Sequence, residues 1–145
     1  MFIKKLSYIP QVDERDCGVA ALAMVAAHYK TRVSLAHLRE IAKTDMEGTT
    51  ALGIVRAAQA LDFDTTPVRA DLSIFDQKDL PYPFIAHVQK DGKYPHYYVI
   101  YGVRGNHLLI ADPDITVGKT KMSKGYFAKE WTGVAIFIAP NPTYK

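Results

Sequence analysis

The spacing of hydrophobic residues changes about halfway along this chain. In the first half, apolar residues recur at helical spacing. The second half holds short runs rich in aromatic and β-branched residues, separated by turn residues such as Gly and Asn, and this pattern predicts strands. Helices followed by strands that turn back on one another indicate an α+β fold, with N-terminal helices packed on a C-terminal antiparallel β-sheet.

Three helices are expected, at residues 17–29, 35–43 and 51–61. The first is apolar on nearly all sides, so it should be buried against several neighbours. Ser34 and Thr50 precede the second and third helices, and their short hydroxyl side chains are typical of N-caps.

Four strands are expected, at residues 84–88, 96–103, 107–111 and 134–138. Asp91-Gly92 predicts a turn between the first two strands, and Gly105-Asn106 predicts a turn between the second and the third. Residues 125–129 predict a short helical turn. Before the first strand, β-branched and aromatic residues indicate short extended segments, at Thr65, Thr66, Val68, Ile74 and Phe75.

The only cysteine, Cys17, stands where a polar loop is expected to become an apolar helix. The first N–H groups of a helix have no partner within it, and the helix dipole is positive at that end. Both effects favour the thiolate, which is the nucleophilic form of cysteine. A lone cysteine is more often a small buried apolar residue, but that role suits a cysteine inside a helix better than one at its first turn.

A cysteine nucleophile needs a base that can later protonate a leaving amine, and imidazole does both. Of the five histidines, His96 begins a predicted strand directly after Pro95, at a rim position where catalytic side chains are often presented. His87 lies within a strand, where a structural histidine is more usual, so His96 is favoured as the base. The other three lie in predicted helices or after a turn, and they are His28, His37 and His107.

An imidazole base also needs an acceptor that orients its ring, usually Asp or Asn. Asp112 ends the strand that returns from the predicted turn, and Asp114 is a rival two residues later. A two-residue loop would pair Arg104 with His107. Strict alternation would then put His96 and Asp112 on opposite faces of the sheet. A three-residue loop or a β-bulge would put them on one face, and the sequence leaves both arrangements open.

Gln11 lies six residues before Cys17, where its side-chain amide could donate to an oxyanion beside the backbone N–H of Cys17. The alternative interpretation is that Gln11 is an ordinary solvated residue in a loop.

The charges near Cys17 do not favour a thiolate. Arg15 offsets only part of the negative charge of the acidic residues before the cysteine, which are Asp13, Glu14 and Asp16. The helix terminus contributes only about 0.3–1 kcal/mol, so a protonated His96 must supply most of the stabilisation of a thiolate.

The length of 145 residues suits one domain, over residues 1–145, with a single sizeable core. One cysteine excludes an internal disulfide, and no run approaches the ~20 apolar residues of a membrane span. The net charge of +3 is too mild for a nucleic-acid-binding surface without a recognisable module. No pair of residues has the spacing of zinc ligands. We therefore expect a soluble, cytoplasmic protein without a metal or a nucleic-acid partner.

Three stretches of the sequence together resemble a known family. They are Gln11-x5-Cys17-Gly18 before the apolar helix, His96-Tyr-Tyr-Val-Ile100 after a proline, and Ala-Asp112-Pro113. In this order and spacing they are similar to the peptidase domain of peptidase-containing ABC transporters. Those domains are papain-like cysteine peptidases that cut the precursors of bacteriocins and quorum-sensing peptides after a double glycine. The likeness covers essentially the whole chain.

The resemblance implies a papain-like cysteine peptidase fold and a role for each matching residue. Cys17 would be the nucleophile, His96 the general base and then the acid, and Asp112 the group that orients His96. Gln11 would donate to the oxyanion. Proteolysis would need no metal or organic cofactor. The leader would bind as an amphipathic helix in an apolar groove, and the sequence does not identify the residues of that groove.

The resemblance also implies partners and a place in the cell. The chain would be the excised N-terminal domain of a longer ABC exporter, on the cytoplasmic side of the bacterial membrane, since it carries neither membrane helices nor ATPase motifs. Its partners would be a precursor peptide with a double-glycine leader and the rest of the exporter. ATP and Mg²⁺ would bind a separate domain of that exporter.

Two other functions fit the same residues. Another papain-like acyl-transfer enzyme, such as an amidase or a transglutaminase, would share Cys17, His96 and Asp112 but would act on amides without a leader. A noncatalytic docking module would bind the leader and would carry an unreactive, structural Cys17. Cleavage assays on peptides with and without a leader distinguish these three functions.

Overall fold

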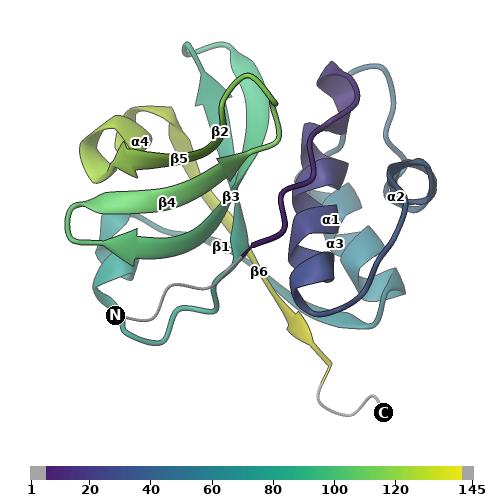
Figure 1. The fold of residues 1–145 in the computed structure, drawn as a ribbon, viewed down its shortest axis with the longest axis horizontal. Coiled ribbons are helices and arrows are strands. Elements are labelled where there is room, and N and C mark those ends of the chain that lie inside the picture. The colour runs from purple at the N-terminus through teal and green to yellow at the C-terminus, as the bar shows by residue number, and fades with distance from the viewer. Residues whose placement is uncertain (1–5, 142–145) are drawn as a thin grey trace.

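Three helices cover one face of a six-stranded sheet in the computed structural model of this chain, which describes residues 6–141 (Figure 1). A 3₁₀ turn, Glu14–Asp16, leads directly into α1 (Cys17–His28). Next come α2 (Leu35–Ala42) and α3 (Ala51–Ala60), and α4 (Lys124–Glu130) packs on the other face of the sheet. Each predicted helix is confirmed to within one residue at either end.

The sheet is antiparallel throughout, and its strands lie in the order β1-β6-β2-β3-β4-β5. The last strand of the chain, β6, therefore lies between β1 and β2, and it runs through the middle of the molecule in Figure 1. This arrangement confirms the α+β fold with N-terminal helices packed on an antiparallel sheet. The strands are β1 (Phe63–Arg69), β2 (Phe84–Lys90), β3 (Tyr94–Arg104), β4 (His107–Asp112), β5 (Gly118–Ser123) and β6 (Trp131–Pro140).

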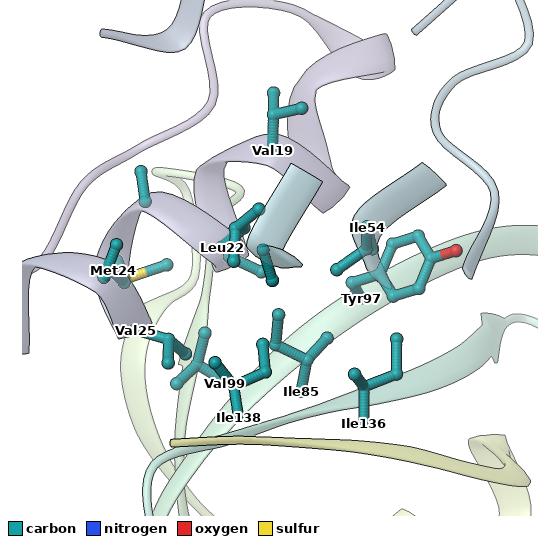
Figure 2. Close-up of a cluster of buried hydrophobic side chains, with 14 of the residues drawn as sticks. Val19, Leu22, Met24, Val25, Ile54, Ile85, Tyr97, Val99, Ile136 and Ile138 are labelled. Atoms are coloured by element: carbon teal, nitrogen blue, oxygen red, sulfur yellow. The ribbon is translucent and has the colours of Figure 1, made fainter. Parts of the chain in front are cut away.

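Helix α1 is buried on every side along most of its length. Residues 17–26 are all buried, because the helix is enclosed by the sheet on one side and by α2 and α3 on the others. Figure 2 shows Leu22 and Val25 of α1 facing Val99 and Ile138 of the sheet. Alanines occupy many of the other positions of α1, so that neighbouring elements approach closely. The prediction of a helix buried against several neighbours is confirmed.

Side-chain caps fix where α2 and α3 begin. Ser34 accepts a hydrogen bond from the backbone N–H of His37 at 3.1 Å, and Thr50 accepts one from Gly53 at 3.0 Å. Each cap contributes about 1 kcal/mol, and both predicted N-caps are confirmed. Gly53 also lets α3 pack closely on α2, because a Cβ atom at this position would lie 2.5 Å from the carbonyl oxygen of Ala42.

Both faces of the sheet are buried, which explains the nearly continuous apolar runs of its central strands. Side chains alternate along β3, so that Tyr97 and Val99 face the helices, whereas Tyr98 and Ile100 face a second core. The second core includes Phe127 of α4. This alternation decides on which face the side chains of β3 lie as far as Ile100.

Two segments differ from the sequence-based expectations. Ile74 and Phe75 do not lie in an extended segment but in a 3₁₀ turn, Leu72–Asp76, which Asp71 caps by accepting from the N–H of Ser73. Strand β5 has no counterpart among the predicted strands. It is an edge strand whose lysines are exposed, so its sequence carries little apolar pattern.

Candidate active site

Cys17 is the first residue of α1, and the polar segment before it folds tightly around Asp16. Asp13 caps the 3₁₀ turn by accepting from the N–H of Arg15 at 2.8 Å. The Asp16 carboxylate accepts from the N–H groups of Val12 and Asp13, at 3.1 and 3.3 Å. Cys17 is left only 5% exposed, at the end of α1 where the N–H groups have no partner within the helix.

A close contact at Gly18 holds the start of α1 against β3. A Cβ atom on Gly18 would lie 3.2 Å from Cε2 of Tyr97 and 3.1 Å from Cβ of Thr49, so a larger residue would displace these neighbours. The Tyr97 hydroxyl donates to the carbonyl oxygen of Thr49 at 2.9 Å. Since Tyr97 directly follows His96 along β3, this contact sets how close the helix terminus lies to His96.

A β-bulge in β3 places His96 and Asp112 on the same face of the sheet. The turn between β3 and β4 has two residues, and by strict alternation these side chains would lie on opposite faces. The register shifts between Ile100 and Gly102, however, so that β3 carries one extra residue. The extra residue reverses the face that Asp112 occupies. Of the arrangements that the sequence leaves open, the bulge is the one that occurs.

Asp112 binds His96 and is closed off from solvent. Its Oδ1 lies 2.6 Å from Nε2 of His96 and accepts from the backbone N–H of Asp114 at 2.9 Å. Its Oδ2 accepts from the ammonium group of Lys90. The Asp112 side chain is only 1% exposed, so these contacts act at a low effective dielectric. With Nε2 engaged, Nδ1 is the ring nitrogen left to face Cys17.

Cys17 contacts the imidazole of His96 on the side opposite Asp112, so that Cys17, His96 and Asp112 form a row. Burial alone would lower the pKa of His96, but hydrogen bonds with Asp112 and Cys17, together with their negative charges, raise it to about 9. Burial would likewise raise the pKa of Asp112, but His96 and then Lys90 lower it overall. The structure therefore brings Cys17, His96 and Asp112 together, with the imidazole in its charged form at neutral pH.

The rival histidine and aspartate have other partners. Nδ1 of His87 lies 3.1 Å from Oγ1 of Thr132, and burial lowers the pKa of His87. Asp114 accepts from the backbone N–H and from the hydroxyl of Thr116, at 3.0 and 2.8 Å. Neither side chain takes part in the row described above.

Gln11 lies beside the end of β4. Its backbone N–H donates to the carbonyl oxygen of Pro113 at 2.9 Å, and the nearby Tyr8 hydroxyl donates to the carbonyl oxygen of Asp112 at 2.6 Å. The side-chain oxygen of Gln11 is buried and has no hydrogen-bond partner within residues 6–141. Gln11 and His96 line the same cavity. The fold thus brings Gln11 close to the His96–Asp112 pair.

Arg39, to which the sequence assigns no role, neutralises the carboxylate next to Cys17. Its Nε and Nη2 atoms donate to the two oxygens of Asp16 at 2.6 and 2.7 Å. Asp16 is fully buried, and the guanidinium holds the pKa of Asp16 below its usual range despite that burial. The partners are 23 positions apart, and no motif joins them, so only the packing of α2 on α1 reveals the pair.

Replacing Arg39 by Met is expected to destabilise the protein by roughly 3 kcal/mol at neutral pH, because a buried carboxylate loses its counter-ion. A carboxyl group with a lowered pKa contributes stability above its ordinary value of 3.8, and this contribution is lost as the pH falls. The difference between the variant and wild type should therefore shrink below about pH 4. Urea denaturation at neutral and at acid pH measures both effects.

The control for this variant is Arg56→Met, which removes the same charge from an exposed position on α3. It should cost less than about 0.5 kcal/mol. An equally small loss for Arg39→Met would contradict the role of the Arg39–Asp16 pair.

Two cavities flank the row of Cys17, His96 and Asp112. One, of about 530 Å³, is lined by Cys17, Tyr97 and Pro95 among others. The other, of about 1050 Å³, is lined by His96 and Gln11 among others, and Pro95 borders it as well. An extended peptide laid across both cavities would therefore pass the cysteine and the histidine in turn.

The fold and this row of side chains define a cysteine peptidase of the papain-like class. The model of the Peptidase C39 family matches residues 5–143, and the chain belongs to that family. Over 145 residues, which is 100% of this chain and 20% of the relative, it is 78% identical to the mesentericin-Y105 transport/processing ATP-binding protein MesD of Leuconostoc mesenteroides. The predicted resemblance to peptidase-containing ABC transporters is confirmed.

Solved structures agree with this assignment. The crystal structure of the peptidase domain of Streptococcus ComA, a bi-functional ABC transporter involved in a quorum sensing pathway, has a TM-score of 0.89 and 56% identity, covering 94% of this chain and 98% of that one. A double glycine motif protease from an AMS/PCAT transporter, in complex with the leader peptide, has a TM-score of 0.85 and 28% identity, covering 95% and 94%. The predicted fold class is therefore confirmed.

The chain spans about a fifth of the length of curated relatives such as MesD and LcnC. Roughly four fifths of those proteins therefore have no counterpart in the 145 residues. Between residues 6 and 141, no helix is both long and apolar enough to cross a bilayer. In the same described part of the chain, no cluster of three or more His, Cys, Asp or Glu side chains is placed to hold a metal ion.

Proposed function

We propose that this chain is a leader peptidase, which hydrolyses the peptide bond after a Gly-Gly pair at the end of the leader of a bacteriocin or quorum-sensing precursor. The observation that carries the proposal is the buried imidazole of His96, which contacts Cys17 on one side and Asp112 on the other. The likeness to a double glycine motif protease bound to a leader peptide supports the substrate class. The likeness to the mesentericin-Y105 transport/processing protein MesD and to a ComA involved in a quorum sensing pathway supports bacteriocin and quorum-sensing precursors.

The proposed chemistry begins with a thiolate on Cys17 beside the imidazolium of His96. The sulfur attacks the carbonyl carbon of the second glycine, forming a C–S bond and an oxyanion. His96 then gives its proton to the leaving amine as the C–N bond breaks, and Asp112 keeps the ring oriented. In the second half, His96 takes a proton from water, whose oxygen attacks the thioester. The leader leaves with a C-terminal carboxylate, and Cys17 is regenerated.

The proposed oxyanion site has two donors. One is the backbone N–H of Cys17 at the start of α1, where the helix dipole favours negative charge. The other is the side-chain amide of Gln11, which lines the same cavity as His96. Removing one such donor typically costs about 10²–10³ in rate. Gln11 therefore serves the transition state and not the binding of the leader.

We also propose that the chain is the N-terminal domain of a longer ABC exporter and acts on the cytoplasmic side of the bacterial membrane. The names of relatives such as MesD and LcnC, which join transport and processing in one ATP-binding protein, support this arrangement. ATP and Mg²⁺ then bind a separate domain, and proteolysis by this domain needs no cofactor. Cleavage of the precursor is coupled to its export.

The test is incubation of the domain with a precursor peptide whose leader ends in Gly-Gly. One cut after the second glycine is expected. Changing either glycine to Ala should lower kcat/KM by about 10²-fold, because a site selective for glycine must leave no room for the added methyl group. The matched control is a peptide that keeps Gly-Gly but lacks the leader, and it should be cut poorly because the leader supplies most of the binding.

Two results would overturn the proposal. Equal cleavage of the leaderless peptide would instead indicate a papain-like amidase or related acyl-transfer enzyme. Binding of the full precursor without any cleavage would indicate a docking module with a structural Cys17.

A further inference from the structure

Lys90 contacts the carboxylate that holds the His96 ring, and no step proposed above uses it. Asp112 binds His96 through Oδ1 and accepts from the Lys90 ammonium group through Oδ2. We infer that Lys90 is a positioning residue for proteolysis, which fixes the Asp112 carboxylate and weakens its hold on the His96 proton. The proton then passes more readily to the leaving amine. This inference rests on the proposed function.

The register of β2 and β3 places Lys90 on the face of the sheet that carries His96. Val88 pairs with His96, and Lys90 pairs with Tyr94, so Lys90 is a diagonal neighbour of His96. Ala86 and Val88 on the same face are fully buried, whereas Lys90 stands at the rim with its side chain 24% exposed. The position of the lysine beside the site therefore follows from strand alternation once the register of the hairpin is known.

A second contact holds the Lys90 ammonium group. Its Nζ lies 5.5 Å from the centroid of the Tyr98 ring, where the ring face attracts a cation. The Tyr98 hydroxyl in turn donates to Oε1 of Glu130 at 2.6 Å, which fixes the ring. An ammonium group held between a carboxylate and an aromatic ring acts at a lower effective dielectric than an exposed lysine.

The charged and titratable groups that face the His96–Asp112 pair come from each neighbouring element. Within residues 6–141, Asp112 forms ion pairs with Lys90 and with His96 itself. Arg15 lines the same cavity as His96 but is paired with Asp13. The other groups that contact the pair are neutral or negative, so Lys90 adds to burial in opposing protonation of His96. The groups are Tyr8 of the N-terminal segment, Cys17 of α1, Lys90 of β2, Tyr98 of β3, Asp114 after β4 and, through Tyr98, Glu130 of α4.

The direction of the effect follows from the charges. The ammonium group on Oδ2 reduces the negative charge that Asp112 offers to the imidazolium, and it also repels the imidazolium. Both effects lower the pKa of His96, which with Lys90 present still stands at about 9. Removing the ammonium charge should therefore raise the pKa of His96. An imidazolium that holds its proton more tightly gives it less readily to the leaving amine.

The test is the midpoint of the His96 imidazole titration, followed by ¹⁵N NMR and assigned with His96→Gln. Lys90→Met and Lys90→Gln should each raise the midpoint by about one pH unit, and the alkaline limb of kcat/KM should move with it. Lys90→Arg keeps the charge and should restore the wild-type midpoint. Lys93→Met is the matched control, because it removes the same charge from an exposed lysine beside Tyr94 in the same hairpin, and its midpoint should equal that of wild type.

The titration needs no substrate, so it separates this inference from the proposed function. A wild-type domain that cuts no precursor would refute the proposed function. The titration midpoints of His96 in wild type and in the Lys90 variants would still test the role of Lys90. Three results would overturn the role of Lys90: a midpoint that stays or falls in the uncharged variants, an equal rise in Lys93→Met, or uncharged Lys90 variants that fail to fold. The last result would show that Lys90 is only structural.

Discussion

Cleavage of a double-glycine precursor falls by about 10⁶-fold when Cys17 is replaced by Ala or His96 by Gln. In the proposed mechanism the two residues act as a unit, since the sulfur would form the bond to the substrate while the imidazole would hold and return the proton. Removing either one therefore costs nearly as much as removing both. The double variant should be no more than a few-fold slower than either single variant. Initial rates of product formation at substrate concentrations below KM give kcat/KM for each variant. Thermal unfolding checks that each variant is folded.

The matched control for the imidazole is His87→Gln. His87 and Cys17 line the same cavity, but the His87 ring contacts Thr132 and its pKa is lowered by burial. Replacing His87 by Gln should lower kcat/KM by less than the factor of about 10²–10⁴ that a general base contributes. A larger loss in His87→Gln than in His96→Gln would contradict the assignment of His96 as the base.

Asp112→Asn is expected to lower kcat by about 10⁴-fold. The amide has nearly the shape of the carboxylate, but it offers no negative charge to the imidazolium, and its nitrogen cannot accept from the ring. Because burial of His96 is then no longer offset by Asp112, the pKa of His96 should fall from about 9. Single-turnover cleavage measures the loss of rate, and NMR titration of the imidazole measures the fall in the pKa.

Asp114→Asn is the control for this second prediction. The Asp114 carboxylate accepts from Thr116, and only its backbone N–H reaches Asp112. The control variant should therefore keep a near wild-type rate and the same His96 titration. Similar losses of rate in the two variants would show that the rate depends on negative charge near the end of β4 and not on the contact of Asp112 with His96.

The sequence predicts the helices and their caps because these depend on neighbours within a few positions. Ser34 and Thr50 are short polar residues directly before apolar periodic segments, and both cap helices in the structure. Cys17 could be placed at a helix terminus on the same grounds. Edge strand β5, with its lysines exposed, offers no comparable pattern and could not be predicted.

The geometry of the site depends on contacts that local patterns do not encode. The bulge between Ile100 and Gly102 decides on which face Asp112 lies. A glycine within a strand favours a bulge, but Gly102 alone does not specify that one forms. Arg39 of α2 binds Asp16 in the turn before α1, and Lys90 of β2 reaches Asp112 of β4 across the one strand between them, β3. Both basic residues resemble ordinary surface residues in the sequence. Their roles become visible only when the register and the helix packing are known.

The central claim is that the fold pairs the sulfur of Cys17 with the imidazole of His96. The rate constant for alkylation of Cys17 by iodoacetamide, measured across the pH range in wild type and in His96→Gln, tests this pairing without any substrate. We predict rapid alkylation in wild type, with a pH dependence that departs from that of a small free thiol, and slow alkylation in His96→Gln. Two curves that coincide and both follow the small free thiol would contradict the claim.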